Sequence, residues 1–349
     1  MAFAPLSASF DTSHLHDDFW VIAVLNNPER FKKRTVLFHE FINRMKNYNA
    51  NLCVVEVAYG ERAFETDDID VPIKVQLRTD SILWHKENMI NIGISRLPSS
   101  WKYVAWIDAD IDFVRPDWIS ETIHELQHFP VVQMFEDVVD LGPDHQIIST
   151  AKGFVACYKN GLPFTLNNGR KNRGGDKSDT LNANNTSSWE DYQYYDSAYT
   201  QKSITWHPGY AWAATREAIN TMGGLLDVGI CGAGDHHMAC SLIGKAEQCI
   251  PTSVTHGYRN AVLQWAERAS RLHKQVGFIK GTIYHFWHGK KRDRRYGDRW
   301  RILTLNEYDP VTHIHKDWQG LLVLYPGHDV LRNDIHNYFK ARNEDSIDV

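Results

Sequence analysis

Cysteine is scarce in this chain of 349 residues, and long hydrophobic runs are missing. The five cysteines are odd in number, scattered and without a CxxC pair, which argues against a zinc ribbon or a disulfide framework and predicts free thiols. No stretch is apolar for long enough to span a bilayer. The first residues lack the basic start and apolar run of a signal peptide. We therefore expect a cytoplasmic protein with no membrane-spanning segment.

An excess of positive charge and several catalytic motifs are missing as well. The formal net charge of -5 excludes the global basic field that drives nucleic-acid binding, although it allows a local basic patch. The sequence has no G-x-G-x-x-G after its first predicted strand, and no Walker A, H-E-x-x-H or G-x-S-x-G motif. These absences disfavour a dinucleotide oxidoreductase, a P-loop NTPase, a zincin and an α/β-hydrolase.

Apolar strands alternate with amphipathic helices through the first half of the chain. The predicted strands are 19–25, 52–58, 73–77, 104–107 and 131–135, and the predicted helices start near 28, 84 and 118. Such alternation is typical of a parallel or mixed sheet with helices on its faces. Hydrophobic residues at 43% and charged residues at 23% suit a globular protein. We expect one large α/β domain.

Carboxylates follow one of the predicted strands directly. Asp108 and Asp110 end the apolar run Val104–Ile107, and Asp112 lies two residues further on. Side chains two apart on a strand point the same way, and ligands of open α/β sheets sit beyond the carboxyl ends of the strands. Carboxylates at such a place are costly unless they are paired or bind a metal. An Asp-x-Asp pair alone is also compatible with a solvated turn.

A second acidic candidate follows glycines in the later part of the chain. The run Gly232-Ala-Gly-Asp-His-His237 places Asp235 at the start of a helix predicted over 235–243. Glycine lets the backbone approach a ligand closely, and a carboxylate there can take a proton from a hydroxyl group. The alternative role for Asp235 is a helix N-cap, where aspartate is common.

Two histidines lie in the run Ile283-Tyr-His-Phe-Trp-His-Gly289, and a basic run follows it. His285 and His288 are candidate metal ligands, but residues three apart on a strand point to opposite faces, so we expect only one of them to serve. The segment Lys290–Arg301 holds seven Lys and Arg against two Asp. Such a run suits a solvated face, a nucleic acid or a diphosphate, which arginine binds with two parallel hydrogen bonds. The pairs His236/His237 and His313/His315 are weaker metal candidates.

In this order, the motifs resemble nucleotide-sugar glycosyltransferases of the GT-A fold. The elements that carry the resemblance are a first nucleotide-binding strand, the helix of Trp84–Ile94, Asp108-Ala-Asp110, the region from Trp212 to Asp235, and a late histidine. The resemblance covers about residues 20–300 and is strongest for galactosyltransferase-like, inverting members. The run before Asp235 departs from the family's Trp-Gly-Gly-Glu-Asp type of motif. The absence of a membrane anchor suits a bacterial or viral cytosolic member.

The resemblance implies a role for each candidate residue. Asp108 and Asp110, with His285 or His288, would hold Mn²⁺ or Mg²⁺ against the diphosphate of a UDP-sugar, and Asp235 would be the base. Trp212 would stack on a sugar. Contacts to the nucleotide and the donor pocket would come from Asn27, Arg34, Glu56, Arg78, Lys86, Asn88 and Asn91.

The chain divides by composition into five segments. They are an N-terminal extension (1–18), a nucleotide-sugar-binding half (19–165), a polar loop (166–188), an acceptor-side half (189–305) and a C-terminal extension (306–349). The loop is predicted either to close over the substrates or to be a surface insertion. Three other functions stay open: transfer of a sugar to a modified DNA base instead of a glycan, nucleotidyl transfer with two metals on Asp108, Asp110 and Asp112, and carbohydrate binding without catalysis.

Overall fold

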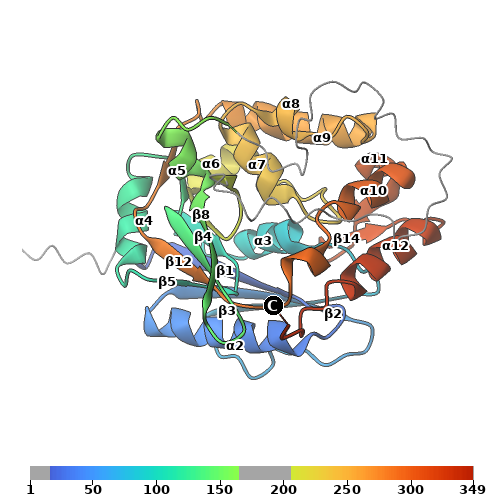
Figure 1. Ribbon diagram of the computed structural model, residues 1–349, viewed down its shortest axis with the longest axis horizontal. Coiled ribbons are helices and arrows are strands. Elements are labelled where there is room, and N and C mark those ends of the chain that lie inside the picture. The colour runs from blue at the N-terminus through green and yellow to red at the C-terminus, as the bar shows by residue number, and fades with distance from the viewer. Residues whose placement is uncertain (1–15, 165–205, 349) are drawn as a thin grey trace, which may run out of the picture.

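The computed structural model describes residues 16–164 and 206–348, so the loop predicted over 166–188 lies outside the described residues. A seven-stranded sheet forms the centre of the molecule, in the order β11-β6-β10-β4-β1-β2-β3 (Figure 1). Its strands are β1 (Phe19–Asn26), β2 (Asn51–Tyr59), β3 (Ile73–Thr79), β4 (Tyr103–Ile107), β6 (Val131–Gln133), β10 (Ala211–Thr215) and β11 (Val276–Phe278). The mixed α/β fold predicted from the sequence is confirmed.

One strand of this sheet runs against the others. β10 is antiparallel to both of its neighbours, β4 and β6, whereas β1, β2, β3 and β4 are parallel. β10 comes from the second half of the chain and lies between two strands of the first half. The described residues of the two halves therefore share one sheet and both of the hydrophobic clusters that pack on its faces, rather than forming separate domains.

A second sheet lies beside the end of β4. It has the order β5-β12-β7-β8-β9 and consists of β5 (Ile111–Phe113), β12 (Thr282–His285), β7 (Asp137–Leu141), β8 (Ile147–Gly153) and β9 (Trp206–His207). The register of β12 with β7 places His285 opposite Asp140, and its register with β5 places His285 opposite Ile111. This sheet thus brings late residues next to the Asp-x-Asp segment.

Helices cover both faces of the central sheet (Figure 1). α2 (Lys32–Asn47) and α4 (Trp118–Leu126) pack against the face that carries Phe19, Val21 and Ala23, and α3 (Lys86–Ser95) packs against the opposite face. The remaining helices are α5 (Phe154–Lys159), α6 (Arg216–Met222), α7 (Gly234–Leu242), α8 (Ala246–Cys249), α9 (His256–Ser270), η3 (Lys291–Arg294), α10 (Asp298–Leu305), α11 (Pro310–His313) and α12 (Asp329–Lys340). A short hairpin, β13 (Ile314–Lys316) with β14 (Leu322–Leu324), precedes α12.

The cysteines differ in part from the prediction. Cys53, Cys157 and Cys231 are free and buried, as expected, but Cys240 and Cys249 form a disulfide. Their separation of nine residues matches no recognised spacing, and the two meet because α8 folds back on α7. Among the described residues, no helix is both long and apolar enough to cross a membrane.

Trp118 provides a test of the core beneath α4. Its ring is fully buried, stacks on Phe113 at 4.5 Å between centroids, and meets the edges of Phe19 and Tyr48. We expect Trp118→Ala to lower the free energy of unfolding by about 3–5 kcal/mol, since it removes a large buried ring and leaves a cavity. Trp318, which is 92% exposed, is the matched control. Trp318→Ala should change the stability by less than about 0.5 kcal/mol in the same urea titration.

Candidate active site

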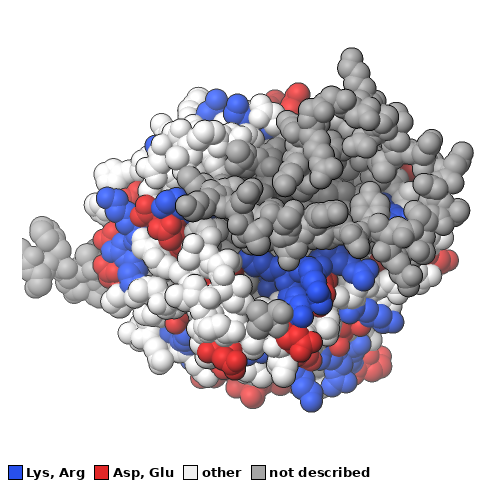
Figure 2. Space-filling view, viewed as in Figure 1, with Lys and Arg blue, Asp and Glu red and all other residues white. Residues whose placement is uncertain are grey.

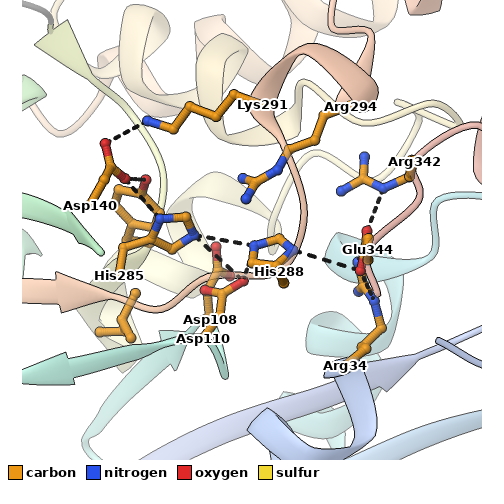
Figure 3. Close-up of polar contacts among 12 residues, drawn as sticks. Arg34, Asp108, Asp110, Asp140, His285, His288, Lys291, Arg294, Arg342 and Glu344 are labelled. Atoms are coloured by element: carbon orange, nitrogen blue, oxygen red, sulfur yellow. Dashed lines mark hydrogen bonds and ion pairs between the residues drawn. The ribbon is translucent and has the colours of Figure 1, made fainter. Parts of the chain in front are cut away.

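Asp110 and two histidines converge beyond the end of β4. The Nε2 atom of His288 lies 2.9 Å from Asp110 Oδ2, and the Nε2 atom of His285 lies 3.9 Å from the same oxygen. The two Nε2 atoms are 3.2 Å apart. One ligand atom from each residue lies within 4.8 Å of the others (Figure 3). This arrangement presents one carboxylate and two imidazoles to a single point.

The expectation that only one histidine reaches the site is wrong. β12 ends at His285, so His288 lies beyond the strand, where the alternation of side chains no longer applies. The chain continues through Gly289, which has a left-handed φ of 85°. The backbone N–H of Phe286 donates to the carbonyl of Asp110 at 2.8 Å and holds this segment against the Asp-x-Asp turn.

A buried carboxylate orients His285. Asp140 on β7 accepts a hydrogen bond from His285 Nδ1 at 2.8 Å, and it also accepts from Ser149 and Lys291. With Nδ1 carrying the proton, the lone pair of Nε2 points toward Asp110. Metal-binding histidines are commonly held in this way by a second carboxylate. Burial lowers the pKa of His285 to about 4, against the opposing effect of Asp140, so its ring is neutral at physiological pH.

Glu344 occupies the equivalent place behind His288. Its Oε2 atom lies 3.7 Å from His288 Nδ1, and its carboxylate is almost fully buried. Arg34 binds this carboxylate with two hydrogen bonds, at 2.6 and 2.8 Å, and Arg342 adds a third at 2.6 Å. Figure 3 shows the chain of contacts from Arg34 through Glu344 to His288. Arg34, predicted as a nucleotide contact, therefore supports the metal cluster from behind.

The cluster fits a divalent cation. Within residues 16–164 and 206–348, Asp110 Oδ1 is a buried oxygen without a hydrogen-bond partner. Burial by itself would raise the pKa of Asp110, but His288 and His285 hold that pKa well below its usual range, so the carboxylate stays charged. A carboxylate oxygen with two imidazole nitrogens is a donor set that suits Mn²⁺ and related ions.

The other two aspartates of the motif have different partners. Asp108 forms an ion pair with Lys86 Nζ. Asp112 lies on β5, where its side chain accepts from the backbone N–H of Phe113 and faces Arg44 at 3.8 Å. The structure thus brings Asp110 to the histidines, places Asp108 beside Lys86 and turns Asp112 away. A shared site for all three aspartates is not formed.

Asp235 lies near Lys86, whose charge also interacts with Asp108. It stands in the first turn of α7, and it lines a small pocket together with Lys86, Gly209, Tyr210 and Trp212. A Cβ atom on Gly209 would come within 2.8 Å of Asp235 Oδ2, so glycine is needed there. Burial alone would raise the pKa of Asp235, but the charges of Lys86 and Arg299 bring that pKa below its ordinary value.

A further acidic residue, Glu87, lies next to Lys86 and Asp235, and it was not predicted from the sequence. Glu87 is 4% exposed, and its carboxyl group packs against Gly234 at the start of α7. Burial raises the pKa of Glu87 to about 8, the charge of Lys86 opposes that rise, and the charge of Asp235 adds to it. Glu87 is therefore protonated at neutral pH, next to a charged Asp235.

Cations of the predicted basic run lie along one side of the cluster formed by Asp110, His285 and His288. Figure 3 shows Lys291 and Arg294 on one side of Asp110 and His288, with Arg342 beside them. Lys291 donates to Asp140 at 2.6 Å. Arg294 is 6% exposed, and its Nε–H has no hydrogen-bond partner among the described residues. Figure 2 shows Lys and Arg side chains gathered near the middle of this face of the molecule.

Most of the predicted nucleotide contacts have structural partners instead. Asn27 caps the entry to α2 by bonding Phe31 and Thr35. Glu56 accepts from Glu65 and Thr66. Arg78 donates to the carbonyls of Gly60 and Arg62. Asn88 bonds Gly320 and Leu322, and Asn91 bonds Leu225 in both directions. These hydrogen bonds hold the loops around the site, and the predicted contacts of these residues to a nucleotide stay a prediction.

Comparison with known proteins finds distant structural similarity only. No family model and no curated protein matches the chain. Among solved structures, it is similar to a Drosophila β1,4-galactosyltransferase 7 mutant in complex with manganese, UDP-Gal and xylobiose, at 9% identity and a TM-score of 0.37, over 90% of this chain and 97% of that one.

Two further solved structures are similar at the same level. One is S. aureus TarS, at 11% identity and a TM-score of 0.32, over 95% of this chain and 89% of that one. The other is described as a nucleotide-diphospho-sugar transferase from Desulfovibrio desulfuricans, at 9% identity and a TM-score of 0.31, over 77% and 81%. The geometry of the site, and not these scores, carries the proposal of function below.

The site contains residues that the sequence patterns did not single out. Asp140, Glu344 and Glu87 complete it from β7, from the segment after α12 and from α3. Asp140 and Glu344 lie in no motif, and their roles depend on contacts with residues more than 50 positions away. Glu87 lies within the predicted helix of 84–96, where a single glutamate is unremarkable without knowledge of its burial.

The raised pKa of Glu87 predicts a pH dependence of stability. Between its ordinary value and about pH 8, the folded state retains a proton that the unfolded state releases, so stability falls as the pH rises. We expect Glu87→Gln to lack this decline in the free energy of unfolding. The difference in stability between the variant and the wild type should therefore increase in favour of the variant up to about pH 8. Urea titrations across this range measure it. Glu61→Gln, at an exposed position, should keep the wild-type slope, and a parallel pair of curves for Glu87→Gln and wild type would contradict the assignment.

Proposed function

We propose that the protein is a metal-dependent glycosyltransferase that moves a sugar from a nucleotide sugar, most simply a UDP-sugar, to an acceptor hydroxyl. The observation that carries the proposal is the convergence of Asp110, His285 and His288, with Lys291 and Arg294 beside them. This arrangement offers a cation site next to buried positive charge, which suits a diphosphate. Asp235 supplies a carboxylate in the adjoining pocket.

The donor side of the reaction would depend on the metal cluster. Asp110, His285 and His288 would hold Mn²⁺ or Mg²⁺, and the ion would supply neutralisation of the charge that develops on the departing diphosphate. The Nε–H group of Arg294 has no hydrogen-bond partner within the part of the chain that the structure describes, and a phosphate oxygen would satisfy it. Asp140 and Glu344 would keep both imidazoles turned toward the ion.

The acceptor side would depend on Asp235. Its pKa is held below the ordinary value, so it is charged and able to accept the proton of a hydroxyl as that oxygen attacks the sugar carbon. The bond from the sugar to the diphosphate breaks as the new glycosidic bond forms, and an in-line attack inverts the configuration. Trp212 lines the same pocket, with its Nε1–H bonded to the carbonyl of Pro208, and its ring would pack on the acceptor sugar.

The described residues favour this function over the alternatives. A two-metal nucleotidyltransferase would need Asp112 beside Asp110, and Asp112 instead faces Arg44. A DNA-base acceptor would draw on the basic run, but Lys291 bonds Asp140 and Arg294 is buried, so these two cations face inward. The released product also separates the classes, because a glycosyltransferase releases a nucleoside diphosphate and a nucleotidyltransferase releases pyrophosphate.

Asp110 and Asp112 form a matched pair for testing the donor site. We expect Mn²⁺ to strengthen the binding of UDP to the wild type, and Asp110→Ala to abolish this Mn²⁺ dependence, since it removes the charged ligand. Asp112→Ala should retain the dependence, because Asp112 contacts Arg44 instead. Isothermal titration of UDP with and without Mn²⁺ measures both. Equal Mn²⁺ dependence in the wild type and Asp110→Ala would overturn the assignment of the metal site.

Asp235→Asn tests the acceptor side. The amide is the same size but accepts no proton, so we expect transfer to fall by about 10²- to 10⁴-fold while Mn²⁺-dependent UDP binding is kept. The assay supplies a panel of UDP-sugars with glycan and DNA acceptors and measures the nucleoside diphosphate released. Normal transfer by Asp235→Asn would exclude Asp235 as the base and would favour a retaining mechanism.

A further inference from the structure

A second group of metal-binding side chains lies on α7 and α8, away from Asp110. One ligand atom each from His236, Cys240 and Cys249 lies within 4.8 Å of the others. His236 and Cys240 are four residues apart on α7, so they lie on the same face of the helix. Cys249 is the last residue of α8. Histidine with two cysteines is a donor set that Zn²⁺ prefers, whereas the Asp110 cluster contains no sulfur.

The spacing of the two cysteines suits either of two states. In the structure they form a disulfide, with their Cα atoms 6.5 Å apart, near the upper end of the usual range for disulfides. Two thiolates on one tetrahedral Zn²⁺ lie roughly 3.8 Å apart, given Zn–S bonds of about 2.3 Å. Because both residues stand on packed helices, the sulfurs need to separate only by small side-chain movements to reach this distance.

The ring of His236 lies beside both cysteines. One of its nitrogen atoms is within 4.8 Å of each sulfur, so all three groups can reach one ion. His236 is partly exposed while both cysteines are buried, so a water molecule can complete a four-coordinate site from the solvent side.

We propose that His236 and the reduced thiols of Cys240 and Cys249 form a zinc site, and that the disulfide is its oxidised, metal-free form. Binding of Zn²⁺ by the two thiols displaces two protons. On oxidation, a small-molecule disulfide takes two electrons from the thiolates and two protons from water, is itself reduced to two thiols, and leaves the Cys240–Cys249 bond with Zn²⁺ released.

The site would act directly on the turn that carries Asp235. His236 follows Asp235, and its backbone N–H donates to Asp235 Oδ1 at 2.7 Å. A metal on the His236 ring therefore fixes the residue that orients this carboxylate. This consequence for transfer rests on the proposed function, whereas the binding of metal by the two cysteines does not.

Cobalt spectroscopy tests the site without reference to activity. The protein is reduced with a phosphine, which is oxidised with one water to the phosphine oxide, and Co²⁺ is then added in the absence of oxygen. Thiolate ligands give cobalt a near-ultraviolet charge-transfer band, which oxygen and imidazole ligands do not give. We expect one equivalent of Co²⁺ to produce this band and Zn²⁺ to abolish it by displacement.

Variants identify the residues that bind the Co²⁺ responsible for this band. Cys240→Ser should lose it, and His236→Ala should weaken Co²⁺ binding at least 10- to 100-fold, since loss of even an outer partner of a metal ligand costs that much. Cys157→Ala and His124→Ala are the controls, at a free cysteine and at a helix-surface histidine, and both should keep the band. Asp110→Ala should also keep it, which separates this site from the proposed donor site.

Three results would overturn the proposal. The first is the absence of the band in the reduced wild type, once titration has shown all five thiols to be reduced. The second is a band of equal strength in Cys240→Ser. The third is a Cys240–Cys249 bond that resists excess reductant in the folded protein. X-ray absorption of the zinc-loaded wild type gives an answer even if a variant does not fold. Two sulfur neighbours at about 2.3 Å support the site, and a shell of nitrogen and oxygen alone contradicts it.

Discussion

The compensation of buried charge around Asp110 is the constraint on which the rest of the site depends. A carboxylate at the end of a buried strand is costly unless partners stabilise its charge. Here two imidazoles face it, and Asp140 and Glu344 hold those imidazoles in place. Glu344 in turn needs Arg34 and Arg342. The result is a series of contacts in which carboxylates alternate with imidazole or guanidinium groups. These contacts join α2, β7, β12 and the segment after α12 around Asp110.

The sequence was sufficient for the fold class and for singling out the residues that meet at the centre of the candidate site. Apolar runs separated by amphipathic helices predicted the strands from β1 to β4, and the helix signals placed α3 and α4 correctly. Asp110, His285, His288 and Asp235 were singled out because carboxylates and imidazoles near strand ends and glycines are informative without a structure. Their convergence could not be predicted, because it follows from the second sheet, which pairs β12 with both β5 and β7.

What could not be predicted was which polar groups are already satisfied. Asn88 and Asn91 were predicted to line a donor pocket, and in the structure their amides bond backbone groups more than 130 residues away. Glu56 is buried under a loop that the sequence places nearby without showing the contact. The same limit hid the Cys240–Cys249 bond, since pairing depends on how α8 packs on α7 and not on spacing.

Lys86 gives the site a property that belongs to neither of its sides alone. Its charge interacts both with Asp108, next to the metal cluster, and with Asp235 in the neighbouring pocket. Any ligand that draws Lys86 toward one carboxylate weakens its hold on the other. Such coupling is reciprocal, so occupation of the proposed donor side and occupation of the proposed acceptor side would change each other's affinity by the same factor. A single partly buried ammonium group would thus link the two sides energetically.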